Sequence, residues 1–96
     1  MPSVVIDLTP ETYHNAVFGD APILLDLYKK GCKSCEVMKP EFERAAYFSQ
    51  GSGVLFGRMR VDNIPEILQM HNITTFPRIL FWHKVLICFG GPFSKL

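Results

Sequence analysis

Strong net charge and long apolar runs are both absent from this sequence, and each absence excludes a class of partner. Ten basic and nine acidic residues leave a formal net charge of +1, so no electrostatic grip on nucleic acid is indicated. The apolar runs are short, as in Ile79-Leu80-Phe81-Trp82, so no membrane-spanning helix is expected. Met1-Pro2-Ser3 leads directly into Val4-Val5-Ile6, which is not the pattern of a signal peptide. We therefore expect neither nucleic acid nor a membrane among the partners.

Cysteine is also scarce, with three in 96 residues. An odd count does not suit a secreted scaffold held together by disulfides. Cys32 and Cys35 form a CxxC pair, and Cys88 stands alone. Apolar residues make up 48% of the chain, which indicates a packed globule rather than a disordered segment. At this length we expect a single domain over residues 1–96.

Strand-like and helix-like segments alternate along the chain. We expect strands over residues 4–6, 23–28, 54–61, 79–83 and 85–89, and helices over about 10–18, 35–48 and 65–70. Thr9 is the expected N-cap of the first helix, and Pro40 is expected to kink the second. This order predicts an α/β fold in which a central mixed sheet has helices on both faces.

The four residues Cys32-Lys33-Ser34-Cys35 carry the chemistry. They follow a predicted buried strand and open a predicted helix, a placement typical of redox-active dithiols. Zinc is the main alternative, but it needs four ligands, and none of the other candidates forms a second paired motif; these are Cys88, His14, His71 and His83. An iron–sulfur cluster bridging two chains is a further alternative for which the sequence gives no positive sign.

We therefore expect no metal and no cofactor. Cys88 alternates with apolar neighbours and is predicted to be a buried core residue. The three histidines are predicted to be solvated or to cap local structure, and Trp82 to pack within the final hairpin.

The chain resembles the thioredoxin superfamily, and within it the catalytic domains of protein disulfide isomerases. The similarity covers about residues 4–91, and its motifs are residues 4–9, 23–28, 32–35, 38–42, 61–62 and 73–77. The resemblance implies a thioredoxin-like three-layer fold and a thiol–disulfide oxidoreductase that acts on protein dithiols and disulfides. It also implies a reductase, an oxidase or glutathione as the redox partner.

The resemblance assigns roles to individual residues. Cys32 corresponds to the nucleophile and Cys35 to the resolving cysteine. Asp26 corresponds to a buried carboxylate below the dithiol; burial raises the pKa of such a group, and it can then move the proton of Cys35. Pro77 corresponds to the cis-proline beside the disulfide, and the backbone of Phe76 to the site that pairs with an extended substrate.

Three departures from the family pattern affect reactivity and binding. Gly31 stands where tryptophan is usual, Lys29-Lys30 replaces Ala-Pro or Ala-Glu, and Lys33-Ser34 replaces Gly-His. A helix N-terminus and nearby lysines both lower the pKa of a thiol such as Cys32, so Lys33 is the predicted tuning residue; a merely solvated basic loop is the alternative. Such tuning should make the disulfide more oxidising than that of an ordinary thioredoxin.

Gly31 is assigned to the substrate-binding surface, but it lacks the apolar side chain that would contact a substrate. This loss keeps open a second hypothesis, a thioredoxin-like module that binds partners with little turnover. The usual C-terminal helix also has no counterpart before Leu96. We therefore expect either a truncated domain or self-association through an uncovered sheet face that exposes Leu80, Trp82, Leu86 and Cys88. An excised isomerase-type domain would belong in the endoplasmic reticulum lumen, and otherwise the cytoplasm is expected.

Overall fold

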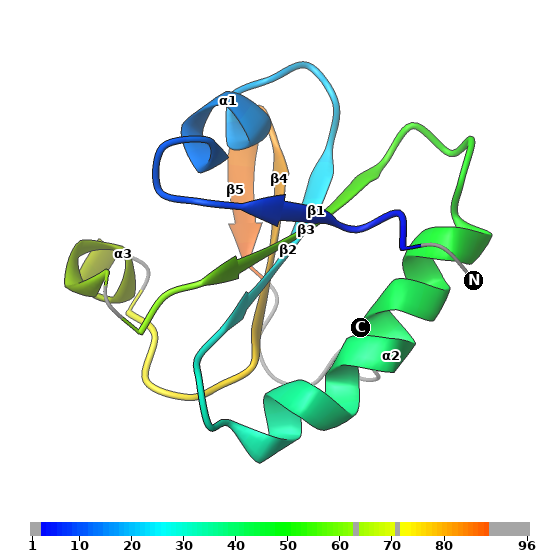
Figure 1. Cartoon of the computed structure of the whole chain (residues 1–96). Coiled ribbons are helices and arrows are strands. Elements are labelled where there is room, and N and C mark those ends of the chain that lie inside the picture. Colours follow the sequence, from blue (N-terminus) through cyan, green and yellow to red (C-terminus); the bar gives the residue numbers. More distant parts are fainter. Residues whose placement is uncertain (1–2, 63, 71, 89–96) are drawn as a thin grey trace.

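The computed structural model describes residues 3–62, 64–70 and 72–88, without the side chains of residues 65 and 85–88. Strands and helices alternate along this part of the chain, as the sequence predicts (Figure 1). The strands are β1 (Ile6–Leu8), β2 (Ile23–Tyr28), β3 (Leu55–Arg60), β4 (Arg78–His83) and β5 (Val85–Cys88). The helices are α1 (Tyr13–Val17), α2 (Lys33–Phe48) and α3 (Pro65–Met70). None of the described helices has the length and hydropathy of a membrane span.

The strands form one mixed sheet in the order β1-β3-β2-β4-β5. The strands β1, β3 and β2 are parallel, whereas β4 and β5 are antiparallel additions on the other side of β2. Because β2 is the central strand, its residues pair on both sides: Asp26 lies opposite Arg58 of β3 and Ile79 of β4. The strand that precedes the CxxC motif is therefore held by two neighbours.

Two apolar clusters, one on each face of the sheet, define the layers. One cluster joins α1 and α3 to the sheet through Tyr13, Val17 and Ile67. The other joins α2 to the sheet, and in it the rings of Phe42 and Phe56 meet edge to face at 5.3 Å between centroids. Figure 1 shows α2 on the side opposite α1 and α3. The predicted three-layer α/β fold is confirmed.

The first elements begin later than predicted. The strand β1 starts at Ile6 rather than Val4, and α1 starts at Tyr13 with Thr12 as its N-cap. The prediction of Thr9 as the cap is wrong, because the preceding residues close a separate turn. In it Thr9 N–H donates to Thr12 Oγ1 at 2.9 Å, and the Thr9 carbonyl accepts the N–H groups of both Thr12 and Tyr13.

The predicted exposed patch on the hairpin is wrong for Leu80 and Trp82, which are both buried. Alternate residues of a strand face opposite sides of the sheet, and these two face the side that α1 and α3 cover. On the other side, Ile79 is buried in the cluster under α2. The side chains of Leu86 and Cys88 lie outside the described residues, as does Phe89, the predicted end of the last strand. Pro40 lies inside α2 as expected, and the kink stays a prediction.

Candidate active site

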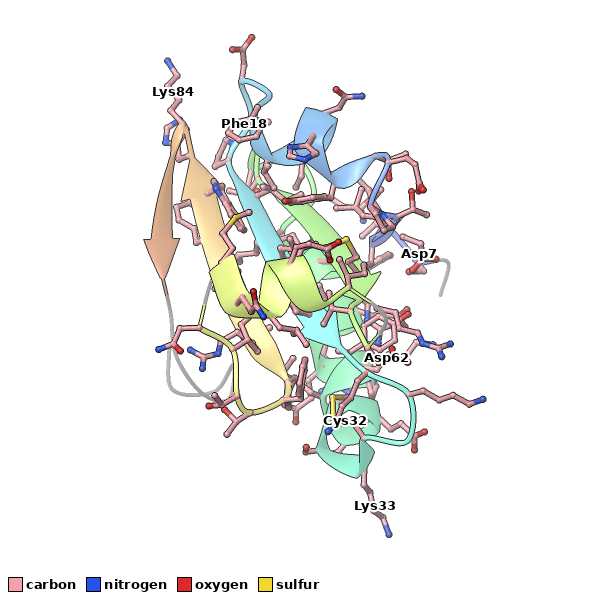
Figure 2. The ribbon with its side chains drawn as sticks, turned by 90° about the vertical axis from the view of Figure 1, so that its left-hand side faces the viewer. Asp7, Phe18, Cys32, Lys33, Asp62 and Lys84 are labelled. Atoms are coloured by element: carbon pink, nitrogen blue, oxygen red, sulfur yellow. A yellow bond between two sulfur atoms is a disulfide. The ribbon has the colours of Figure 1, made fainter. Side chains whose placement is uncertain are left out.

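The dithiol lies at the start of α2, directly after the central strand. Cys32 and Cys35 form a disulfide with their Cα atoms 5.2 Å apart, seen as a yellow bond in Figure 2. Cys32 is the N-cap of α2, and its Sγ accepts the backbone N–H of Cys35 at 3.2 Å. The first N–H groups of a helix have no partner within the helix. Here one of them is directed at the sulfur, where it can also stabilise a thiolate after reduction.

The two cysteines differ in exposure in the order that the family roles require. Cys32 is 8% exposed and Cys35 is 2% exposed. Cys32 is therefore the more accessible of the two cysteines. Gly31 precedes this pair with a φ of +74° and no neighbouring atom within 4 Å of the position that a Cβ would occupy. The turn into the helix thus depends on the backbone freedom of glycine.

A segment far along the chain completes the site. The Phe76–Pro77 peptide bond is cis, as predicted. Ser34 Oγ donates a hydrogen bond to the carbonyl of Phe76 at 3.2 Å and lies 3.4 Å from Cys32 Sγ. One serine therefore links the dithiol to the loop that carries the cis-proline. The sequence named Ser34 only as a departure from the family pattern and gave no signal of this link.

Asp26 is fully buried and paired with a residue that the sequence analysis missed. The Arg58 Nε donates to Asp26 Oδ2 at 3.2 Å, and Arg58 is 7% exposed. Among the described residues, Asp26 Oδ1 has no hydrogen-bond partner. Burial raises the pKa of Asp26 from 3.8 to about 6, although the hydrogen bond and positive charge of Arg58 act to lower it. The sequence offered one signal for Arg58: it lies inside the predicted strand over residues 54–61, whereas the other arginine there, Arg60, lies near the end of that strand.

The strand pairing determines which face of the sheet carries this ion pair. Leu24 and Phe56 belong to the cluster under α2, and Asp26 and Arg58 follow them two residues later, on the same face of β2 and β3. The guanidinium carbon of Arg58 lies 4.1 Å from the ring centroid of Tyr28, so the cation is held between an aromatic ring and a carboxylate. The buried acid and its counterion are therefore on the sheet face that carries the active-site helix.

The lysines around the site occupy different positions. Lys29 Nζ lies 5.2 Å from the centroid of the Phe76 ring, so this side chain reaches the cis-proline loop. Lys33 is exposed, and Figure 2 shows its side chain directed away from Cys32 into solvent. The structure therefore brings Gly31 and the Cys32–Cys35 disulfide to the Phe76–Pro77 loop. It places Asp26 on the sheet face that carries α2, while Lys33 stays at the edge.

A metal site has no support in the described part of the chain. There, no group of three or more histidine, cysteine, aspartate or glutamate side chains is arranged to hold a metal ion. Two of the zinc candidates, His71 and the Cys88 side chain, lie outside that part.

Comparisons with known proteins agree with this geometry. The Thioredoxin family model matches residues 4–86. A probable protein disulfide-isomerase A6 of Medicago sativa is 29% identical over 85 residues, which are 86% of this chain but 23% of that protein. A thioredoxin of Alicyclobacillus acidocaldarius is 28% identical over 89 residues, which are 93% of this chain and 79% of that protein. The chain thus spans a minor part of the isomerase and most of the thioredoxin.

Solved structures give the same result for the fold. The Trx4 domain of ERdj5 is 27% identical with a TM-score of 0.81, and the match covers 94% of this chain and 83% of that domain. Malassezia sympodialis thioredoxin shares the fold with a TM-score of 0.82 at 23% identity, covering 98% of this chain and 85% of the other. The family model spans most of the chain, and the disulfide has the spacing found in thiol–disulfide oxidoreductases. This chain therefore belongs to the thioredoxin family.

Proposed function

We propose that this chain exchanges disulfides with protein substrates, with Cys32 as the nucleophile and Cys35 as the resolving cysteine. The observation that carries the proposal is the Cys32–Cys35 disulfide at the N-terminus of α2, beside the cis-Pro77 loop. In the reducing direction, the Cys32 thiolate attacks a substrate disulfide, forms a mixed disulfide and releases one substrate thiolate. The Cys35 thiolate then attacks the Cys32 sulfur and releases the second substrate thiolate, so two electrons pass from the protein dithiol to the substrate. The oxidising direction reverses these steps.

The second step needs a base, because the thiol of Cys35 must lose its proton before it attacks. We assign this role to Asp26, which is buried on the face of the sheet that carries α2. A carboxyl with a pKa of about 6 can accept and return a proton near neutral pH. Arg58 keeps the pKa of this carboxyl from rising above the neutral range, since its hydrogen bond and positive charge lower the pKa of Asp26.

The cis-proline loop and the turn before the helix form the proposed docking surface for substrates. The backbone of Phe76, next to Pro77, would pair with an extended polypeptide, and Gly31 leaves open space on the other side of the disulfide. Lys29 over Phe76 supplies positive charge beside the cis-proline loop, and exposed Lys33, which points into solvent (Figure 2), adds a weaker, screened contribution. Both charges favour the thiolate form of Cys32. A reductase, an oxidase or glutathione would restore the dithiol or disulfide after each turnover.

A Cys35→Ser variant tests the exchange reaction. Without a resolving thiol, the mixed disulfide cannot be released, so the variant should accumulate covalent adducts with unfolded proteins that contain disulfides. Adducts separated by non-reducing electrophoresis should disappear in the matched Cys32→Ser/Cys35→Ser control. A binding module with little turnover, the alternative that Gly31 favours by offering no apolar contact, would give no adducts above that control.

Equilibration with glutathione tests the direction of the reaction. The lysines near the dithiol lead us to expect a reduction potential above about −270 mV, the value typical of thioredoxin. A potential at or below that value would contradict the oxidising character and would leave the exchange reaction itself in place.

A further inference from the structure

The Ser34 hydroxyl stands between the two halves of the site. Its oxygen lies 3.2 Å from the Phe76 carbonyl oxygen and 3.4 Å from Cys32 Sγ. A serine hydroxyl has one proton to donate. In the disulfide form neither sulfur carries a proton, so Ser34 is the donor to whichever acceptor it serves. A carbonyl oxygen is a much better acceptor than a neutral sulfur, so the Phe76 carbonyl is its acceptor in this state.

Reduction changes the balance between these two acceptors. A disulfide sulfur is neutral and accepts weakly, whereas a thiolate is charged, and hydrogen bonds to charged groups are roughly twice as strong as neutral ones. When Cys32 becomes a thiolate, the hydroxyl gains more by donating to Cys32 Sγ than by donating to Phe76. A rotation about the Ser34 side chain is sufficient, because both acceptors are already within reach of the same oxygen.

We propose that Ser34 is a positioning residue whose hydroxyl changes its hydrogen-bond acceptor when the thiolate forms. The proton stays on Ser34 Oγ, and the hydrogen bond switches from the Phe76 carbonyl to the Cys32 sulfur. The proposal rests on the exchange function above. The same rotation that stabilises the nucleophile uncovers the carbonyl at which an extended substrate would dock its N–H. Thiolate formation and docking therefore favour each other, and by linkage each strengthens the other to the same degree.

Neighbouring groups hold the two acceptors of the Ser34 hydroxyl in place. The N–H of Cys35 holds Cys32 Sγ from the helix side, and Lys29 lies over the ring of Phe76. Both acceptors are thus fixed by contacts that do not involve Ser34. Ser34 itself is exposed, so water competes for its hydroxyl and moderates the effect.

Titration of Cys32 tests the first half of the proposal. In a reduced Cys35→Ser/Cys88→Ala background, Cys32 is the one remaining cysteine, so the ultraviolet absorbance of the thiolate reports Cys32. Ser34→Ala should move the titration midpoint upward by about half to one pH unit. Ser34→Thr, which keeps a hydroxyl, should restore it, and Ser52→Ala in a remote loop should leave it unchanged. An unmoved midpoint in Ser34→Ala, or the same upward shift in Ser34→Thr, would overturn the proposal.

Carbon-13 NMR of the Phe76 carbonyl tests the second half. In the same reduced background with Cys32 as the one cysteine, the carbonyl resonance should follow the Cys32 titration when Ser34 is present, because the hydrogen bond from Ser34 to this carbonyl is lost as the thiolate forms. With Ser34→Ala this response should largely disappear. An equal response in both proteins would show a direct effect of the thiolate charge on the carbonyl and would refute the switch of the Ser34 hydrogen bond. Neither readout requires turnover, so failure of the exchange reaction would appear separately, as missing adducts in the Cys35→Ser trap.

Discussion

Replacement of Asp26 by asparagine should stabilise the protein, and the gain should depend on pH. The pKa of Asp26 is about 6 in the folded protein against 3.8 for the ordinary carboxyl. This difference of about two units corresponds to about 3 kcal/mol in the free energy of unfolding. Because the folded pKa is raised, the contribution of the acid is fully present below the unfolded pKa and is lost as the pH rises through about 6. Asparagine resembles the protonated acid and never incurs this loss.

The expected result is therefore a pH-dependent difference between the unfolding free energies of the variant and the wild type. Above pH ~7 the Asp26→Asn variant should exceed the wild type by up to about 3 kcal/mol, and near pH ~3.5 the two should agree. Urea unfolding of both oxidised proteins at matched pH values measures this difference. With a slope of about 1–3 kcal/mol per molar urea, the midpoint should move by about 1–3 M at neutral pH.

Wild type and variant carry the same other ionisable groups, so the contribution of those groups to the pH dependence cancels when the two unfolding free energies are subtracted. Asp7→Asn provides the control, since Asp7 is exposed and its side chain lies at the surface (Figure 2). If Asp26→Asn proved less stable than the wild type at neutral pH, the ion pair with Arg58 would outweigh the burial of the carboxylate. A stability difference independent of pH would equally refute the raised pKa.

The remaining predictions concern the counterion and the turn before the helix. Arg58→Met removes the charge that lowers the pKa of Asp26, so a carbon-13 titration of that carboxyl should give a higher midpoint, whereas Arg58→Lys should move it less; an unchanged midpoint in Arg58→Met would remove Arg58 from the site. Gly31→Ala should cost about 1 kcal/mol, because φ is +74° while the added methyl group has open space. Urea unfolding should rank glycine above asparagine and asparagine above alanine at this position, and equal stabilities would contradict the strain.

The fold was predictable because helices and strands are indicated by local patterns, namely the spacing of apolar residues and the glycine and proline residues between segments. The nearly continuous apolar run over residues 23–28 indicates a strand buried on both faces, and the structure places it at the centre of the sheet. Asp26 was conspicuous in the sequence because it interrupts that run. The boundaries were less predictable: the Thr9–Thr12 hydrogen bonds that delay α1 depend on side-chain geometry that a pattern of residue types does not contain.

The contacts of the site were harder to predict because they join distant segments. Arg58 meets Asp26 across 32 residues, and this pairing follows from the parallel register of β2 and β3. Ser34 meets Phe76 across 42 residues, and only the packing of the cis-proline loop against α2 brings them together. The exposure predicted for Leu80 and Trp82 was wrong for a related reason: strand alternation gives two faces, but the sequence does not say which face a helix covers.

Along the sequence, one exposed loop separates the two halves of the site, the dithiol and the cis-proline loop. Gly51 and Gly53 both have positive φ and open space around them, and the 16 residues of α2 place this loop about 24 Å from the dithiol. A chain cut there would carry Cys32 and Cys35 on one fragment and Phe76–Pro77 on the other, with β2 of the first fragment pairing to β3 and β4 of the second. Disulfide exchange assisted by the cis-proline loop would then require the two fragments to reassociate, so the loop around Gly51 and Gly53 is a position at which the protein could be divided into two complementing fragments.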